Sequence, residues 1–197
     1  MNRKRSNDGT MTRRDEIIKA SARIFAEKGY HSTTLDEIAR EIGVTKPALY
    51  YHISSKEEIL REIIGKIMEA MEEVIRVGRS NLPPREKVGK MVQMLVKSGT
   101  ERKETTLIAF EQVKLLSQRS RDALRRRQKD VEQVLQQTLK EGVEEGCFAI
   151  DDIKMASFAI IAVSNWVYRW YRPDGYLKPT QIADQLIHLL ENGYMKR

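Results

Sequence analysis

Apolar side chains recur every three or four residues along most of this 197-residue chain, in runs that end at glycine, proline or polar residues. This spacing places the apolar side chains on one face of an α-helix, whereas a half-buried strand alternates strictly. Aromatic residues make up only 7% of the chain, and helix-forming residues recur throughout, which disfavours a β-sandwich or barrel. We therefore expect an all-α fold of nine helices, at 12–28, 34–42, 45–51, 55–79, 85–99, 104–117, 120–145, 151–171 and 179–192.

The composition is that of a soluble globular protein, with 41% hydrophobic and 32% charged residues. No apolar stretch approaches the roughly 20 residues that cross a bilayer, and residues 1–10 are too polar for a secretory signal. A cytoplasmic protein is expected. The net charge of +7 is compatible with nucleic-acid binding but does not establish it.

Enzyme chemistry finds little support in the sequence. The three histidines, His31, His52 and His188, lack the spacing of metal ligands, and neither a phosphate-binding glycine loop nor a nucleophilic-serine motif is present. The single cysteine, Cys147, follows Gly146 and is interpreted as an inert thiol. We therefore predict no catalytic residues, no metal site and no cofactor.

Residues 33–56, TTLDEIAREIGVTKPALYYHISSK, carry the most specific pattern. Two short helices, each capped by a threonine hydroxyl, flank Gly43, where glycine allows a left-handed turn. Small or apolar residues can hold the two helices together, namely Ala39, Val44 and Leu49. This arrangement predicts a helix-turn-helix, whose second helix enters the major groove of DNA.

The run GVTKPALYYHISSKEEIL, preceded by FAEKGYHSTTLDEIA, resembles the N-terminal signature of TetR-family transcriptional regulators. The resemblance covers about 12–60, and Ile53 stands where the family usually has an aromatic residue. It implies a DNA-binding domain at 12–54 and an effector-binding and dimerisation domain at 55–197. Residues 1–11 would form a flexible basic arm that is either a solvated tail or a phosphate contact.

The resemblance also implies which side chains contact DNA. Thr33 or Thr34 would bind a phosphate at the N-terminus of its helix, and Lys46 would donate to guanine. Bases and backbone would be contacted by Thr45, Lys46, Pro47, Ala48, Tyr50, Tyr51, His52 and Lys56. Local packing of Tyr50 or His52, and solvation of Lys56, are the alternatives.

By the same resemblance, segments 151–171 and 179–192 would pair across a two-fold axis, which predicts a homodimer on a palindromic operator. The residues of this seam would be Ala156, Ala159, Ile160, Val163, Ile182, Leu186, Leu189 and Leu190. Ordinary core within one chain is the alternative interpretation of these positions.

Segment 157–177 places two tryptophans beside a polar stripe of Asn165, Arg169 and Arg172. Such a combination suits a ligand with an apolar body and an anionic head. Its W-x-x-x-W-Y-R-P-D-G pattern is similar to TetR-family repressors that sense acyl-CoA esters of lipid or steroid breakdown. Candidate effector contacts are Met68, Met94, Phe110, Phe158, Asn165, Trp166, Arg169 and Trp170.

Three alternatives remain open for the C-terminal half. The tryptophans and arginines could be ordinary structural residues. The effector could be another hydrophobic molecule, as in drug-efflux repressors, or the chain could be a helical dimeric adaptor that does not bind DNA. The basic run between Arg119 and Lys129 is either a solvated face or a contact for the phosphates of CoA.

Overall fold

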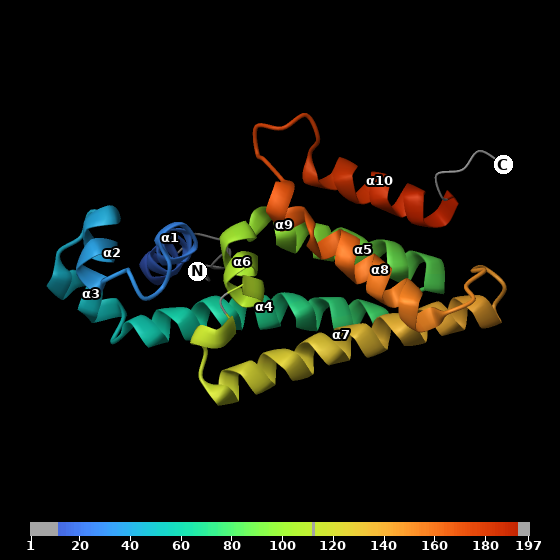
Figure 1. Ribbon diagram of the computed structural model, residues 1–197, viewed down its shortest axis with the longest axis horizontal. Coiled ribbons are helices and arrows are strands. Elements are labelled where there is room, and N and C mark those ends of the chain that lie inside the picture. Colours follow the sequence, from blue (N-terminus) through green and yellow to red (C-terminus); the bar gives the residue numbers. More distant parts are fainter. Residues whose placement is uncertain (1–11, 112, 193–197) are drawn as a thin grey trace, which may run out of the picture. The chain divides into compact units, whose positions relative to one another are not determined.

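The computed structural model describes residues 12–192 apart from residue 112, so the predicted basic arm lies outside the described residues. The described part of the chain has ten α-helices, one 3-10 turn and no strand. Figure 1 shows how these helices follow one another along the chain. The all-α prediction is confirmed. None of these helices combines the length and the apolar character needed to cross a membrane.

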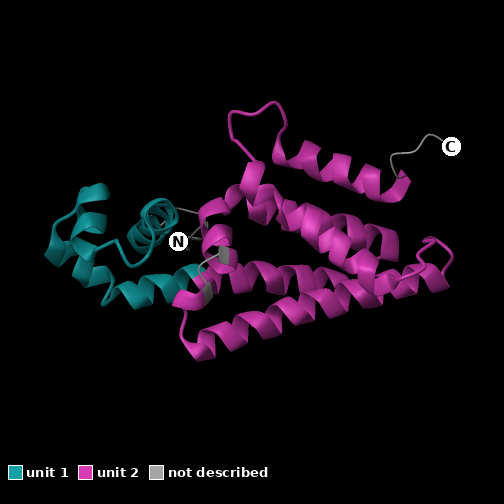
Figure 2. Cartoon of the chain, in the orientation of Figure 1, with its two compact units in different colours: residues 1–63 teal, residues 64–197 magenta. Residues whose placement is uncertain are grey.

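The chain divides into two compact units, residues 1–63 and 64–197 (Figure 2). The boundary between the units falls inside helix α4 (Lys56–Gly78). The boundary predicted from the sequence lies between residues 54 and 55. The first two turns of α4 group with the N-terminal unit, where Glu58 and Lys56 form side-chain hydrogen bonds to α1 and to the loop that follows it.

The N-terminal unit contains α1 (Arg13–Lys28), α2 (Leu35–Glu41), α3 (Lys46–His52) and the start of α4. Each of the first three helices begins after a threonine, as predicted. The threonine hydroxyl accepts a hydrogen bond from the backbone N–H of the residue three positions later. Between α2 and α3, Gly43 has a φ of 69°. This is the left-handed conformation that glycine adopts without steric cost.

The core of the N-terminal unit is built from large side chains that are at most 1% exposed: Ile17, Phe25, Ile38, Leu49, Ile53, Ile59 and Ile63. Leu49 is the only buried residue of α3. This helix is therefore attached through one internal side chain and through Ile53, which directly follows it.

The C-terminal unit contains the rest of α4, α5 (Pro84–Glu101), α6 (Lys103–Glu111), the 3-10 turn Val113–Leu115, α7 (Gln118–Glu144), α8 (Ile153–Asn165), α9 (Val167–Trp170) and α10 (Pro179–Asn192). Helix α5 is its centre, because it contacts each of α6, α7, α8, α9 and α10. Met91, Val92, Leu95 and Val96 of α5 are the middle of one continuous apolar core.

The prediction of a single helix over 151–171 is wrong, because the chain turns at Trp166. Because of the turn, the consecutive residues Val167 and Tyr168 are both buried. In a straight helix, consecutive side chains point about 100° apart, so burial of both on one face is less favourable. Gly99 of α5 makes room for it, since a Cβ at Gly99 would lie 3.3 Å from the backbone nitrogen of Tyr168. The predicted helix over 104–117 likewise ends at Glu111 and is followed by the 3-10 turn.

The residues of the predicted dimer seam differ in burial, and Ala156 and Leu186 are partly buried against the core. Ile160 and Ile182 are buried in the core of their own chain, as in the alternative interpretation. Val163, Leu189 and Leu190 are 41%, 46% and 38% exposed.

Candidate DNA-reading surface and effector cavity

Helix α3 presents a polar and largely exposed face. Because Leu49 points into the core, its neighbours on the helix point outward, and Tyr50 and Tyr51 are 46% and 87% exposed. The predicted base-contacting residues are also exposed: Thr45, Lys46, Pro47 and Ala48. The structure therefore brings most of the predicted DNA contacts together on one surface.

Lys46 is held at the N-terminal end of this surface by Asp36 of α2. Its Nζ lies 2.9 Å from a carboxylate oxygen of Asp36, and both side chains are 56% exposed. The hydrogen bond to Asp36 raises the pKa of Lys46, so the ammonium is charged at neutral pH. The pair places a cation at the start of α3, on the exposed face of the helix.

Of the two threonines proposed to bind phosphate, the structure buries Thr33. Its hydroxyl donates to the carbonyl oxygen of Gly29 at 2.9 Å and has no exposed surface. Thr34 is exposed and caps α2. The expectation for Thr33 therefore needs correction, and Thr34 remains as the phosphate-binding candidate.

Lys56 is neither a solvated lysine nor an open phosphate contact. Its Nζ donates to the carbonyl oxygens of Tyr30 and Thr33, each at 2.8 Å, and lies 4.4 Å from the centre of the Tyr30 ring. An ammonium has three donors, so at most one remains for DNA. The main contact of Lys56 is with the loop between α1 and α2.

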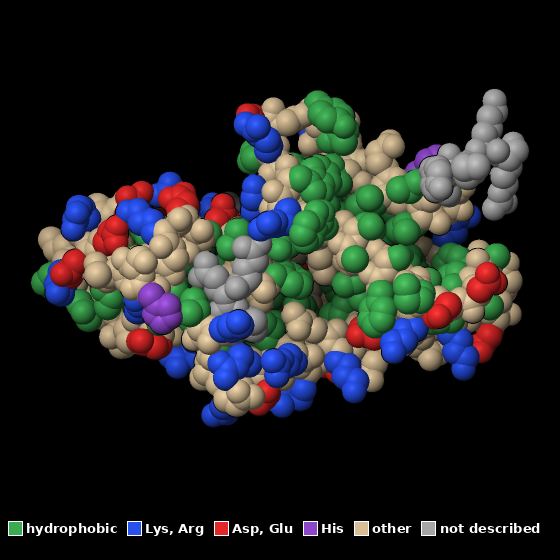
Figure 3. Space-filling model, viewed as in Figure 1, with side chains coloured by type: hydrophobic (Ala, Val, Ile, Leu, Met, Phe, Trp, Pro, Cys, Tyr) green, Lys and Arg blue, Asp and Glu red, His purple; other side chains and the backbone are tan. Residues whose placement is uncertain are grey.

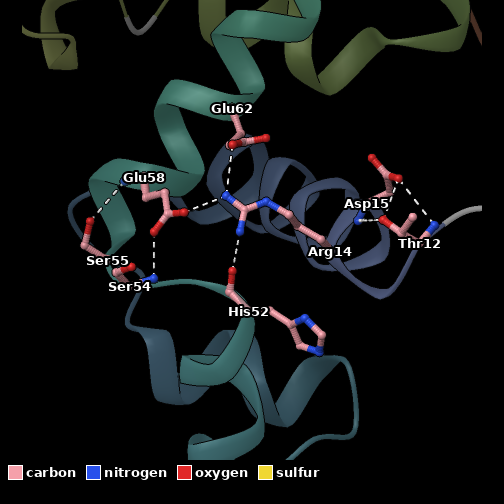
Figure 4. Close-up of polar contacts among 8 residues, drawn as sticks. All are labelled: Thr12, Arg14, Asp15, His52, Ser54, Ser55, Glu58 and Glu62. Atoms are coloured by element: carbon pink, nitrogen blue, oxygen red, sulfur yellow. Dashed lines mark hydrogen bonds and ion pairs between the residues drawn. The ribbon is translucent and has the colours of Figure 1, made fainter.

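The C-terminal end of α3 is joined to α4 by Arg14 of α1, as Figure 4 shows. The Arg14 guanidinium donates to the His52 carbonyl oxygen, and to the carboxylates of Glu58 and Glu62 at 2.5 and 2.9 Å. Glu58 also accepts the backbone N–H of Ser54 at 2.7 Å. Arg14, and then Ser54, lower the pKa of the Glu58 carboxyl to about 2.

The C-terminal unit contains a cavity of about 850 Å³. Helices α4, α5, α6 and α8 supply most of its apolar walls, and α7 adds Val131. Its apolar lining includes Ile67, Met71, Val74, Met94, Leu95, Phe110, Phe158 and Ile161. This volume falls within the range of small-molecule binding sites.

One side of the cavity is polar and basic. Helix α7 contributes Arg125, Lys129 and several glutamines, and Lys154 of α8 adds a further cation. Figure 3 shows Lys and Arg side chains gathered over the first half of α7, below apolar side chains of α8. Among the described residues, Glu132 is the only carboxylate in the lining. An apolar chamber with a mostly cationic edge matches an amphiphile with an anionic end.

The cavity includes half of the predicted effector contacts, which are Met94, Phe110, Phe158 and Asn165. Met68, Trp166, Arg169 and Trp170 are not in its lining. The two tryptophans are 58% and 49% exposed, and the Arg169 guanidinium lies 5.6 Å from the Trp166 ring centre. The turn at Trp166, which the sequence did not predict, places these residues on the surface rather than inside.

Several lining residues were not predicted, including Val74, Thr106, Ile161 and the glutamines of α7. Their spacing in the sequence indicates only an amphipathic helix. No local signal could have identified them, because the cavity is assembled from five helices. Within the described residues, no group of His, Cys, Asp or Glu could hold a metal ion.

Comparison with known proteins identifies both units. Residues 17–63 match the family model of bacterial regulatory proteins of the TetR family. Residues 81–194, more than half of the chain, match the tetracyclin repressor-like C-terminal domain.

Some relatives are similar over nearly their whole length. HTH-type transcriptional repressor KstR2 of Mycolicibacterium smegmatis is 29% identical over 189 residues, which are 92% of this chain and 90% of the relative. The ketosteroid transcriptional regulator KstR2 of Mycobacterium tuberculosis superposes with a TM-score of 0.79 at 26% identity, over 95% of this chain and 97% of that one.

AibR, solved with isovaleryl coenzyme A and operator DNA, superposes with a TM-score of 0.76 at 26% identity, over 93% of this chain and 100% of that one. These relatives are regulators and not enzymes, which confirms the expectation that this chain is not an enzyme. The chain belongs to the TetR family and is a transcriptional repressor of the helix-turn-helix type.

Proposed function

We propose that this repressor acts in the cytoplasm as a homodimer on a palindromic operator, and that an acyl-CoA-type effector releases it from genes of lipid, fatty-acid or steroid catabolism. The observation that carries the effector proposal is the apolar cavity with cations at one edge. Two relatives support this class of effector and of target gene: KstR2 is called a ketosteroid regulator, and AibR was solved with isovaleryl coenzyme A.

For DNA, we propose that Lys46 donates to guanine while Pro47 and Ala48 contact thymine methyl groups. The phosphate contacts would come from exposed or half-buried polar groups around α3, which are Thr34, Tyr50, Tyr51 and His52. Thr45 would share the base-contacting role of Lys46. The exposure of this face supports the assignment, because no described residue of the N-terminal unit buries it.

For the homodimer, the support is the exposed apolar surface of α8 and α10. Met155, Val163, Leu189 and Leu190 are all more than one-third exposed. Soluble monomers rarely expose contiguous apolar patches of large area. Pairing these two helices with those of a second copy would cover the patch and give the two recognition helices two-fold symmetry.

For the effector, the acyl body would occupy the chamber between Val74, Leu95 and Phe158. The anionic part would meet Arg125, Lys129 and Lys154 at the edge. Asn165 lines the cavity, and Trp166 follows it in the chain. A ligand long enough to leave the cavity there could also contact the predicted surface group of Trp166, Arg169 and Trp170.

Release of DNA would be transmitted through α4. Four of its residues line the cavity, Ile67, Ala70, Met71 and Val74, and its first two turns belong to the N-terminal unit. An effector shifts the equilibrium between the DNA-binding state and the released state only as far as it binds one of these states better than the other. A 100-fold preference corresponds to about 2.7 kcal/mol.

A neutral hydrophobic effector of the drug-efflux type is the second candidate. The apolar walls favour it as well as they favour an acyl chain. The two candidates differ in the role of the cations at the cavity edge. These cations would stabilise an anionic acyl-CoA and would contribute nothing to the affinity for a neutral ligand.

The test is fluorescence anisotropy of labelled DNA from upstream of the coding region, at one stated salt concentration. Isovaleryl-CoA and longer acyl-CoA esters are titrated into the complex, with free CoA and a neutral hydrophobic dye as controls. Release by an ester but not by CoA or dye is the expected result. Release by the dye alone would favour the efflux type, and indifference to every ester would overturn the acyl-CoA class.

A further inference from the structure

The Arg14 contacts join three helices at one point. One guanidinium nitrogen binds the last carbonyl of α3, and the other binds two carboxylates one turn apart on α4. The Glu58 carboxylate also accepts a hydrogen bond from the backbone N–H of Ser54, in the segment between α3 and α4. We call this set of residues, Arg14, His52, Ser54, Glu58 and Glu62, the Arg14 clasp (Figure 4).

Helix α3 is short and has few internal contacts. It is seven residues long with one buried side chain, Leu49, and Ile53 directly after it is also buried. At its start, Lys46 forms an exposed ion pair with Asp36, which holds a helix only weakly. The last carbonyls of any helix lack partners within it, and a cation at that end is favourable. A hydrogen bond at the last residue therefore adds a polar restraint where α3 leads into α4.

We propose that Arg14 is a positioning residue for DNA reading, which sets the orientation of α3 against α4 without itself binding DNA. Arginine suits this role because its planar fork can serve acceptors on two helices at once, which an ammonium does less well. The three acceptors engage both terminal nitrogens of the guanidinium, which has five N–H donors in all, and 38% of the side chain is exposed. The proposal requires only the DNA binding of the family and is independent of the effector.

Loss of Arg14 is predicted to reduce the fraction of molecules whose α3 is oriented to bind the operator, and not to remove a contact with DNA. If α3 samples several orientations, apparent operator affinity falls by the fraction of molecules in the competent one. Random-sequence DNA, which is bound mainly through phosphates, should be affected much less. A positioning role therefore lowers the preference for the operator, whereas a loss of folded protein lowers binding to both DNAs equally.

The experiment compares Arg14→Met, Arg14→Lys and a matched control, Arg23→Met, in the full-length protein. Arg23 lies on the same helix, pairs with Glu41 and is 52% exposed. Binding to operator and to random DNA is measured by anisotropy at several salt concentrations. We expect Arg14→Met to lose about 10- to 100-fold in operator affinity, Arg14→Lys to recover part of this, and Arg23→Met to stay near wild type.

The salt dependence separates positioning from direct contact. Loss of a phosphate contact reduces the slope of log affinity against log salt by about one. We expect the slope for Arg14→Met to equal that of Arg23→Met. A slope reduced by one for Arg14→Met alone, unchanged operator preference, or full recovery with Arg14→Lys would each overturn the proposal.

A second variant guards against simple unfolding. Glu62→Gln removes one charged acceptor and leaves the bonds of Arg14 to His52 and Glu58. If Arg14→Met lowers the helix content measured by circular dichroism, the comparison is made with Glu62→Gln, for which we expect a loss of operator preference of about threefold to tenfold. Wild-type preference in Glu62→Gln would contradict the proposal.

Discussion

The two units hold their functional residues in opposite ways. In the N-terminal unit, most of the residues proposed to contact DNA lie on one short helix and project outward, and a few internal contacts hold that helix. In the C-terminal unit, the residues that line the cavity come from five helices and point toward one another. A surface for a large, regular polymer can be built from consecutive residues, whereas a chamber for a small molecule has to be enclosed by distant ones. The following predictions test this contrast, from the largest expected effect to the smallest.

Leu49→Ala should have the largest effect, because it removes the one buried side chain of α3. Truncating a fully buried leucine costs about 2–5 kcal/mol, and we expect that loss in urea unfolding followed by circular dichroism. Ala48→Gly, on the exposed side of the same helix, should cost no more than about 1 kcal/mol. Equal losses for the two variants would contradict the assignment of inner and outer faces.

Lys46→Ala should leave stability nearly unchanged and lower operator affinity by about 1–3 kcal/mol. The discrimination between operator and random DNA should fall with it, since the contact is proposed to be with a base. Anisotropy with both DNAs measures this effect. An operator preference equal to that of wild type would show that Lys46 does not read a base.

Acid should destabilise the N-terminal unit through Glu58. Its pKa is about 2 in the folded protein and near 4.5 without these contacts, so the unfolded chain binds more protons between these values. Stability from this group is therefore complete above about pH 5 and is lost as the pH falls toward 2. Solvent screening limits the effect to about 1 kcal/mol.

The measurement is urea unfolding across this pH range, for wild type and Glu58→Gln. The difference between the two proteins should shrink on acidification. A difference that stays constant from pH 6 to pH 2.5 would show that the Glu58 carboxylate is not stabilised in the folded state.

Lys129→Gln should have the smallest effect, and only on the effector. Lys129 is an exposed cation at the cavity edge, so its removal should weaken an anionic ligand by about 1.5- to 5-fold. Lys140→Gln is the matched control, since Lys140 lies on the same helix, pairs with Glu144 and does not line the cavity. Isothermal titration with the acyl-CoA that releases the operator provides the measurement, and equal affinities for the two variants would exclude Lys129 as a contact.

The same contrast explains what could be predicted from the sequence. The caps at Thr12, Thr34 and Thr45 and the turn at Gly43 depend on neighbours a few residues away, so the helix-turn-helix was predictable almost residue by residue. Burial of Thr33 and the internal hydrogen bonds of Lys56 depend on the loop after α1, and local spacing did not reveal them.

The cavity depends on contacts between distant parts of the chain. The turn at Trp166 is accommodated by Gly99 on another helix, and no pattern within 151–171 indicates it. Trp166, Arg169 and Trp170 were therefore expected to contact the effector, and they lie outside the cavity lining. Residues such as Met94 and Phe158 were predicted because any apolar helix face has a fair chance of meeting a central chamber.

The single buried side chain of α3 has a consequence for how such a repressor can diverge. Of the seven residues of this helix, five are exposed and His52 is half-buried, so most of its sequence is free to vary without loss of the fold. Mutations that change the preferred operator should therefore accumulate at almost no thermodynamic cost. A library randomised at Lys46, Pro47 and Ala48 should yield many folded members with new DNA preferences, and a duplicated copy of this protein could acquire a separate set of target genes in a few steps.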